Sequence, residues 1–423
     1  MGRRVAGAKK ILIVSMEALV PRVTASRERI YRMVERLARN HAVDVATTVR
    51  DAAEAAESRA LLRGVCRAFH PITPINPLGS QLRRKLRAAE FLLLHRPRHH
   101  PHHYFYGGHP RVLAQLAELV DRHRYDVVQA EYWYMGRLFE RIGAGVFTAI
   151  DTHDVLSDRE RQQVFRRHDD DPPPRARRAL ATYRELEIRC LRLADLVIAI
   201  SADDQAAFAG LELGNQTLLV PIGQDLDRFT PDGAAVAKDD VVLFYGNLGG
   251  HNNVQAFFRL WRAIFPLIRQ RVPGARLLVV GANPPDSIRR LHDGHGVIVT
   301  GFVEDVRPHL ARAKVAVIPL DIAAGFRGRV VDLMALAVPV VGTRRALDCL
   351  QMTSGVHGFI TDSDAEMAGH AARLLSDDAL RLAMGARCRA LAEERYTVEA
   401  TYGVLSDYYL GLGGDVTPRR PDG

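Results

Sequence analysis

The sequence contains few of the features that cross-link a small secreted protein or anchor a protein in a membrane. Only four of its 423 residues are cysteines, they are widely separated, and none forms a C-x-x-C pair. This spacing argues against zinc ribbons, redox motifs and a disulfide framework. No run approaches the ~18 apolar residues of a membrane span, and Glu17 interrupts the apolar segment 11–20. We therefore expect a soluble, cytoplasmic protein without a signal peptide.

Lysine is also scarce, since five of the 58 basic residues are lysine and the rest are arginine. Against 49 acidic residues this gives a net charge of +9. Such a balance suits nucleic acid, an anionic membrane face or a phosphorylated ligand. No nucleic-acid recognition module is present, so we expect no nucleic-acid partner. The length and a hydrophobic content of 47% predict two or three globular domains.

Short apolar runs alternate with amphipathic segments along the chain, a pattern typical of βαβ units and parallel sheets. Helices are expected at 27–39 and 175–193, and Ser201 with Asp204 resembles a capping box. A segment rich in Pro, Gly and Asp at 218–240 reads as a connection between two doubly wound halves. The expected strands are 10–15, 43–48, 126–129, 147–151 and 196–201, then 241–245, 277–280, 297–300, 315–319 and 339–342.

Two polar segments contain residues that could bind a metal ion, but the spacing of these residues does not favour a metal site. The histidine-rich segment 95–110 matches no zinc template and contains prolines, so a surface loop that could contact an acceptor or a membrane is preferred. The acidic segment 168–174, like the shorter 225–227 and 362–364, reads as a turn. We expect no metal site.

The most informative segment, AAGFRGRVVDLMALAVPVVGT at 323–343, is expected to contain a strand, a glycine-bearing loop, a helix start and then another strand. Gly325 and Gly328 allow close approach of the backbone, and a helix N-terminus presents N–H groups to an anion. Arg327 and Arg329 add positive charge, so a pyrophosphate is the expected guest. Asp332 could accept hydrogen bonds from ribose hydroxyls. The alternative is that Asp332 complements the helix dipole and that the arginines are solvated.

The order of these motifs resembles glycosyltransferase family 4, also called group 1, whose members typically read G-x-G-x-R-x-K-x-x-E-A-M-A-x-G-x-P-V-V. The resemblance extends through VPIGQDLDRFTP, FYGNLGGHNN, PGARLLVVGANPP and VTGFVED and covers most of 195–405. It implies an α/β fold of the GT-B type, with two facing doubly wound Rossmann-like domains around a cleft. The implied division is an acceptor-side domain 1–221, a nucleotide-sugar domain 222–395, and a segment 396–423 whose helix returns to the first domain.

The resemblance also implies a reaction. Retaining enzymes of this family move a hexosyl group from a nucleotide sugar, UDP-sugar by default, to an acceptor hydroxyl, without a metal or a resident cofactor. The acceptor would be a glycan, a lipid-linked glycan or a small-molecule natural product. A basic chain of this kind would suit peripheral contact with the cytoplasmic membrane face.

Position by position, the resemblance assigns roles to particular residues. Asp332 stands where the family grips the donor ribose, Arg327 and Arg329 would neutralise the diphosphate, and His153, in the T-x-H context of AIDTHDVLS, would lie beside the donor sugar. These implied catalytic residues are His153, Arg327 and Arg329. The implied donor-binding residues are Asp332, Gly246, Asn247, Asn253, Gly301, Phe302, Val303, Gly325, Phe326 and Gly328, with Gly301, Phe302 and Val303 at the nucleobase.

The chain also departs from the family pattern. Many members have arginine and lysine where this chain has Asn247 and Asn253, and Ala324 replaces a glutamate that holds the sugar hydroxyls. The loop SMEALVPRV lacks the usual paired glycines, and Arg22 or Arg27 could face the diphosphate, the acceptor or solvent. These changes indicate either altered specificity or a degenerate GT-B protein that acts as a binding or partner subunit.

Overall fold

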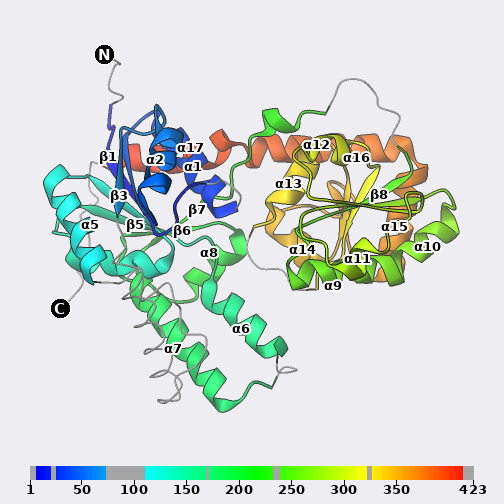
Figure 1. Cartoon of the computed structure of the whole chain (residues 1–423), viewed down its shortest axis with the longest axis horizontal. Helices are drawn as coiled ribbons and strands as arrows, with labels where there is room; N and C mark the ends of the chain where they lie inside the picture. The colour runs from blue at the N-terminus through cyan, green and yellow to red at the C-terminus, as the bar shows by residue number, and fades with distance from the viewer. Residues whose placement is uncertain are drawn as a thin grey trace. The chain divides into compact units, whose positions relative to one another are not determined.

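The computed structural model describes residues 6–20, 25–72, 110–167, 171–231, 239–321 and 326–412. Four features singled out in the sequence, Arg22, Ala324, Gly325 and the histidine-rich segment up to residue 109, lie outside these ranges. The chain divides into two compact units, Met1–Pro221 with Thr401–Gly423, and Ile222–Ala400 (Figure 1). Each unit is described by itself.

The first unit is built on a parallel sheet with the strand order β3-β2-β1-β4-β5-β6-β7. Residues 11–14 of β1 are at most 1% exposed, because helices cover both faces of such a sheet and continuous apolar runs fill it. The order reverses direction between β1 and β4, which makes the carboxyl ends of these strands the expected place for a ligand. The strands are β1 Lys10–Ser15, β2 Ala42–Thr48, β3 Ala68–Ile72, β4 Val127–Glu131, β5 Phe147–Asp151, β6 Leu196–Ala199 and β7 Gln216–Leu219.

Helices pack on both faces of this sheet. The expected cap is present, since Ser201 Oγ accepts the backbone N–H of Asp204 at 3.1 Å. The last helix in the described part of the chain packs against this sheet, where the Tyr409 hydroxyl donates to Gln129 of the central strand β4 at 2.8 Å. The helices are α1 Ala25–Leu37, α2 Ala52–Leu62, α5 Pro110–His123, the 3₁₀ segment η1 Trp133–Arg141, α6 Leu156–Arg167, α7 Pro174–Leu191, α8 Ala202–Ala209 and α17 Val398–Gly411.

The second unit has a parallel sheet with the order β10-β9-β8-β11-β12-β13, which reverses direction between β8 and β11. Its strands are β8 Val241–Tyr245, β9 Arg276–Val280, β10 Val297–Gly301, β11 Val315–Ile318, β12 Val340–Gly342 and β13 Gly358–Ile360. Its helical segments are η2 Leu226–Phe229, α9 His251–Arg259, the π-helical η3 Leu260–Ile264, α10 Phe265–Arg271, α11 Asp286–Arg289, α12 Arg307–Ala311, α13 Gly328–Ala335, α14 Arg344–Leu347, η4 Asp348–Leu350, α15 Asp364–Ser376 and α16 Asp378–Arg395.

Two parallel-sheet α/β units confirm the predicted fold class. The sequence pattern missed β3, β7 and β13, which all lie at the edges of their sheets. β3 and β7 are only partly buried and β13 has three residues, so none of them has the continuous apolar run that marks a central strand. Two predicted strands also end or begin one residue too far, at Pro319 and Pro339, where proline has no N–H for the ladder. Among the described residues, no helix is long and apolar enough to cross a membrane.

Candidate functional site

In the second unit, asparagine side chains brace the loop that follows β8. Asn247 Oδ1 accepts the backbone N–H of Gly249 at 3.0 Å and the amide of Asn283 at 3.3 Å. Asn253 Nδ2 donates to the backbone carbonyl of Asn247 at 2.8 Å. Asn247 and Asn253, both assigned to donor binding above, thus use these groups to shape the loop. Asn283 was missed, and its only sequence signal is that it closely follows β9.

Two glycines let the loops after β8 and β9 touch. The backbone N–H of Gly246 donates to the carbonyl of Val280 at 3.1 Å. A Cβ atom built on Gly281 would lie 1.7 Å from the Gly246 carbonyl oxygen. No side chain fits at Gly281, so the backbone surface at this end of the sheet is fixed by two residues without side chains.

The helix α13 places Asp332 next to the last residue of β8. Asp332 is buried, and the Tyr245 hydroxyl lies 3.4 Å from its Oδ2 and donates to it. The Arg329 guanidinium lies over the Tyr245 ring, 5.7 Å from its centroid. Burial raises the pKa of Asp332 to about 7, although the charge of Arg329 and the Tyr245 hydrogen bond act in the opposite direction. The structure therefore brings Asp332 and Arg329 together with Tyr245, which sequence reasoning missed.

The start of α13 is tightly packed. Arg327 occupies the N-cap position, and a Cβ atom on Gly328 would lie 2.6 Å from the side-chain nitrogen of Gln224. The Phe326 ring packs 5.4 Å from the Tyr396 ring, centroid to centroid. Gly328 thus makes room for the segment that enters this unit, and Phe326 contributes to the core beside the loop.

The three residues assigned to the nucleobase lie at the end of β10. Gly301 has a φ of +71°, a backbone conformation that favours glycine. Phe302 is 75% exposed, whereas Val303 packs against the core of the unit. A solvent-exposed aromatic ring at a strand end is suited to stacking on a planar ligand.

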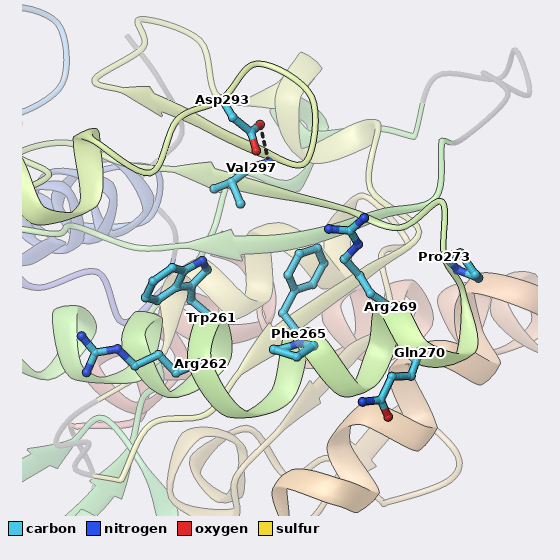
Figure 2. A pocket seen from close by; sticks show the side chains of 9 residues that line it. Trp261, Arg262, Phe265, Arg269, Gln270, Pro273, Asp293 and Val297 are labelled. Atoms are coloured by element: carbon cyan, nitrogen blue, oxygen red, sulfur yellow. Dashed lines mark hydrogen bonds between the residues drawn. The ribbon is translucent and has the colours of Figure 1, made fainter.

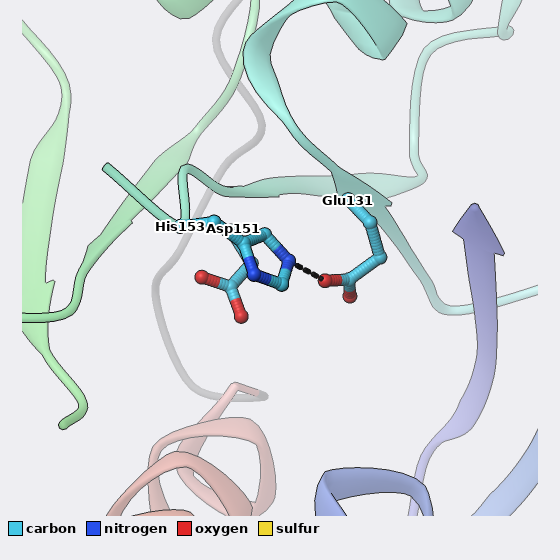
Figure 3. A group of neighbouring side chains, drawn as sticks. All are labelled: Glu131, Asp151 and His153. Carbon is cyan, nitrogen blue, oxygen red and sulfur yellow. Dashed lines mark hydrogen bonds and ion pairs between the residues drawn. The ribbon is translucent and has the colours of Figure 1, made fainter. Parts of the chain in front are cut away.

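In the first unit, His153 belongs to a buried polar cluster (Figure 3). Its Nε2 lies 2.7 Å from Oε2 of Glu131, the last residue of β4. Its ring stacks on Tyr132 with a centroid distance of 4.2 Å. Glu131 is fully buried, and both burial and the nearby charge of Asp151 raise the pKa of Glu131. Sequence reasoning found His153 but not Glu131.

Asp151, the last residue of β5, is paired with Arg29 of α1, and both side chains are fully buried. Arg29 Nε lies 2.8 Å from Oδ2 of Asp151, and Arg29 Nη2 lies 3.2 Å from Oδ1. Glu131, Asp151 and His153 are near enough to one another to hold a metal ion. Because both oxygens of Asp151 accept hydrogen bonds from Arg29, the geometry favours a hydrogen-bond network, and the absence of a metal stays a prediction.

A separate groove of about 780 Å³ lies in the second unit, at the amino ends of β9 and β10 (Figure 2). Pro273 precedes β9 and Asp293 precedes β10, so this groove is at the amino ends of the strands. Asp293 accepts backbone N–H groups of its own turn. The groove contains none of the residues predicted above; its lining is Trp261, Arg262, Phe265, Pro266, Arg269, Gln270, Pro273, Asp293 and Val297.

Comparison with solved structures supports the fold. The chain is similar to HepE of Anabaena in complex with UDP, with a TM-score of 0.66, 17% identity, and coverage of 95% of this chain and 100% of HepE. It is also similar to sucrose-phosphate synthase of Thermosynechococcus elongatus, with a TM-score of 0.68, 17% identity, and coverage of 96% and 99%. These likenesses and the two sheets define a protein with two Rossmann-like domains.

Sequence comparison finds similarity to glycosyltransferases over part of the chain. Residues 239–377 match the family model of group 1 glycosyl transferases. A GDP-mannose-dependent alpha-(1-6)-phosphatidylinositol monomannoside mannosyltransferase of Mycobacterium tuberculosis is 28% identical over 243 residues, which are 51% of this chain and 62% of that protein. The chain thus spans less than two thirds of that relative. These matches support the predicted resemblance to the group 1 glycosyltransferases.

Proposed function

We propose that the protein is a retaining glycosyltransferase that moves a hexosyl group from a nucleotide sugar to an acceptor hydroxyl. The observation that carries this proposal is the position of buried Asp332, with Tyr245 and Arg329, at the point where the strand order of the second sheet reverses. Parallel α/β sheets bind nucleotides at this point. A carboxyl group there can accept hydrogen bonds from ribose hydroxyls.

Departure of the nucleoside diphosphate would be assisted electrostatically. Arg327, at the N-cap of α13, and Arg329 would stabilise the negative charge that builds up on the leaving group, together with the positive end of the helix dipole. Such preorganised groups stabilise the transition state more than the ground state, which is what raises the rate. Gly301, Phe302 and Val303 would hold the nucleobase.

His153 would contact the donor sugar and stabilise the transition state. The bond between the anomeric carbon and the phosphate oxygen would break as the acceptor hydroxyl attacks that carbon. The attack would come from the same face of the sugar that the diphosphate leaves. The leaving phosphate would take the proton of the acceptor hydroxyl. No step of this scheme requires a metal ion or a resident cofactor, because the charge is neutralised by arginines and the helix.

The donor nucleotide is the finer part of the proposal. HepE, a structural neighbour, was solved with UDP and with UDP-glucose, whereas the mycobacterial relative is named for GDP-mannose. We propose a UDP-sugar as the first candidate and a GDP-sugar as the second. The acceptor would be a glycan, a lipid-linked glycan at the cytoplasmic membrane face, or a small-molecule natural product.

A thermal-shift panel of UDP, GDP, ADP and TDP tests the proposal, because a ligand that binds only the folded state raises its melting temperature. We expect one nucleotide to raise the melting temperature of the wild type and of Asp286→Ala, a control that removes an exposed carboxylate of α11. The same nucleotide should give no shift with Asp332→Ala. If no nucleotide shifts the wild type, the partner-subunit alternative is favoured. An undiminished shift in Asp332→Ala would show that the ribose lies elsewhere.

A further inference from the structure

We propose that Glu131 is a positioning residue for His153: it holds Nε2–H of the imidazole and leaves Nδ1 as the nitrogen available to the donor sugar. This inference rests on the proposed function, since it assumes that His153 acts on the sugar. Glu131 itself would touch neither substrate nor donor.

The strand register creates the arrangement. Glu131 and Asp151 are paired neighbours at the carboxyl ends of β4 and β5, so their side chains leave the sheet on the same face. Both carboxyl groups are fully buried, and two buried like charges repel each other. Arg29 compensates Asp151. His153, two residues beyond β5, lies against Glu131, with its Nε2 2.7 Å from Oε2 of the carboxyl group.

Glu131 is itself held rigidly. Its Oε1 accepts the side-chain amide of Gln129 at 2.8 Å, and the carbonyl oxygen of that amide accepts the Tyr409 hydroxyl at 2.8 Å. Because the amide oxygen of Gln129 accepts from Tyr409, its NH₂ group is the end that points at Glu131. The remaining oxygen of Glu131 is therefore directed at the imidazole, and a carboxylate acceptor selects the tautomer with hydrogen on Nε2.

The backbone shows that the ring orientation is imposed. His153 has a φ of +57° and Tyr132, whose ring stacks on it, has a φ of +69°. Residues with side chains adopt such conformations rarely, and they persist only where their surroundings determine them. A histidine that served only to neutralise a buried carboxylate would not require strain at both stacked rings. The strain, the stacking and the hydrogen bond together point to a ring held for use.

The test uses the full-length protein with Glu131→Ala, Glu131→Asp and His153→Ala, and Glu54→Ala as a control for removal of a mostly buried glutamate from the same unit. Misplacing a reacting group by about 1 Å lowers rates by about 100-fold. We expect kcat for sugar transfer to fall by about 100-fold in Glu131→Ala and in Glu131→Asp, whose carboxylate is one methylene too short, with an unchanged KM for the donor. Glu54→Ala should keep the wild-type kcat. The double variant Glu131→Ala/His153→Ala should be no slower than His153→Ala.

A second readout does not depend on activity. Nitrogen NMR of ¹⁵N-histidine-labelled protein should show the Nε2–H tautomer for His153, assigned by its loss in His153→Ala, and a tautomer mixture in Glu131→Ala. Wild-type kcat in Glu131→Ala, or an unchanged tautomer in that variant, would overturn the inference. A wild type that binds no nucleotide and transfers no sugar would instead overturn the proposed function, while the tautomer would still report whether Glu131 orients the ring.

Discussion

Asp332 is a carboxylic acid in a place where its charged form is poorly solvated, with a pKa of about 7. In the unfolded chain the same group ionises near pH 4, so between these values the folded state binds a proton that the unfolded state has lost. The free energy of unfolding should therefore fall as pH rises from about 4 to about 7, by at most ~1.4 kcal/mol per pH unit from this group. Urea unfolding at several pH values should show that Asp332→Asn removes this part of the slope. An identical pH profile in both proteins would contradict the prediction.

The same ionisation should control nucleotide binding. Only the ionised carboxylate offers all of its oxygen lone pairs to the ribose hydroxyls, so affinity should rise several-fold as pH passes through about 7. Calorimetric titration from pH 6 to pH 8 measures this directly. In Tyr245→Phe the pKa of Asp332 should rise further, because the hydroxyl that donates to the carboxylate is gone, and the transition should move to higher pH. A pH-independent affinity in the wild type would rule out the carboxylate as the ribose acceptor.

Among single residues, the sequence identifies the candidate site residues that belong to a motif. It misses the residues whose role comes from contacts with other strands or helices. Asp332 and Arg329 lie one turn apart in a recognisable segment, so their proximity follows from helix geometry. Tyr245 reads as the last apolar residue of a strand, and Glu131 as a polar residue in a buried one. The roles of Tyr245 and Glu131 depend on which strand or helix lies beside them. The strand order of the sheet determines these neighbours, and it cannot be read from a local sequence pattern.

At the scale of elements, the loops after β8 and β9 should tolerate no side chain at Gly281. The Cβ atom of Gly281→Ala would overlap the Gly246 carbonyl, so the two loops must separate, at a cost of roughly 3 kcal/mol. Gly274→Ala is the matched control, because its Cβ would meet nothing within 4 Å. Chemical denaturation should show a large loss for the first variant and almost none for the second. If nucleotide binding survives unchanged in Gly281→Ala, these loops do not form the donor site.

The central elements could be predicted from sequence because their physical signal is local. The buried apolar runs of β1, β5 and β8 end within one residue of their expected bounds. The helix start expected at the glycine-bearing loop is also present, with Gly328 as the first residue of α13. The edge strands β3, β7 and β13 could not be predicted, since their pairing partner, rather than their own apolar content, makes them strands.

At the scale of the whole molecule, one buried arginine joins the distant parts of the first unit. Arg29 donates to the carbonyl oxygens of Val220 and Pro221, where the chain leaves this unit. Its guanidinium also lies over the ring of Tyr402, 5.5 Å from the centroid, where the chain has just returned. Arg29 also forms an ion pair with Asp151 at the end of β5, two residues before His153. It therefore connects the segments where the chain leaves and re-enters the unit to the carboxyl end of β5.

Loss of this arginine should therefore destabilise the first unit selectively. The chain has two tryptophans, fully buried Trp133 in the first unit and Trp261 in the second, so a Trp261→Phe background makes fluorescence a reporter of the first unit alone. In that background, Arg29→Met should lower the free energy of unfolding by about 3–5 kcal/mol, because Asp151 is left as an uncompensated buried charge.

The design separates a lost ion pair from lost packing. Arg184→Met removes an exposed pair with Asp158 and should cost less than about 1 kcal/mol. Arg29→Met/Asp151→Leu should recover part of the loss, since replacing both partners of a buried pair by apolar groups leaves no charge unsolvated. Equal losses in Arg29→Met and Arg184→Met would mean that the buried pair does not hold the unit together. A double variant as unstable as Arg29→Met would instead assign the effect to the contacts with Val220, Pro221 and Tyr402.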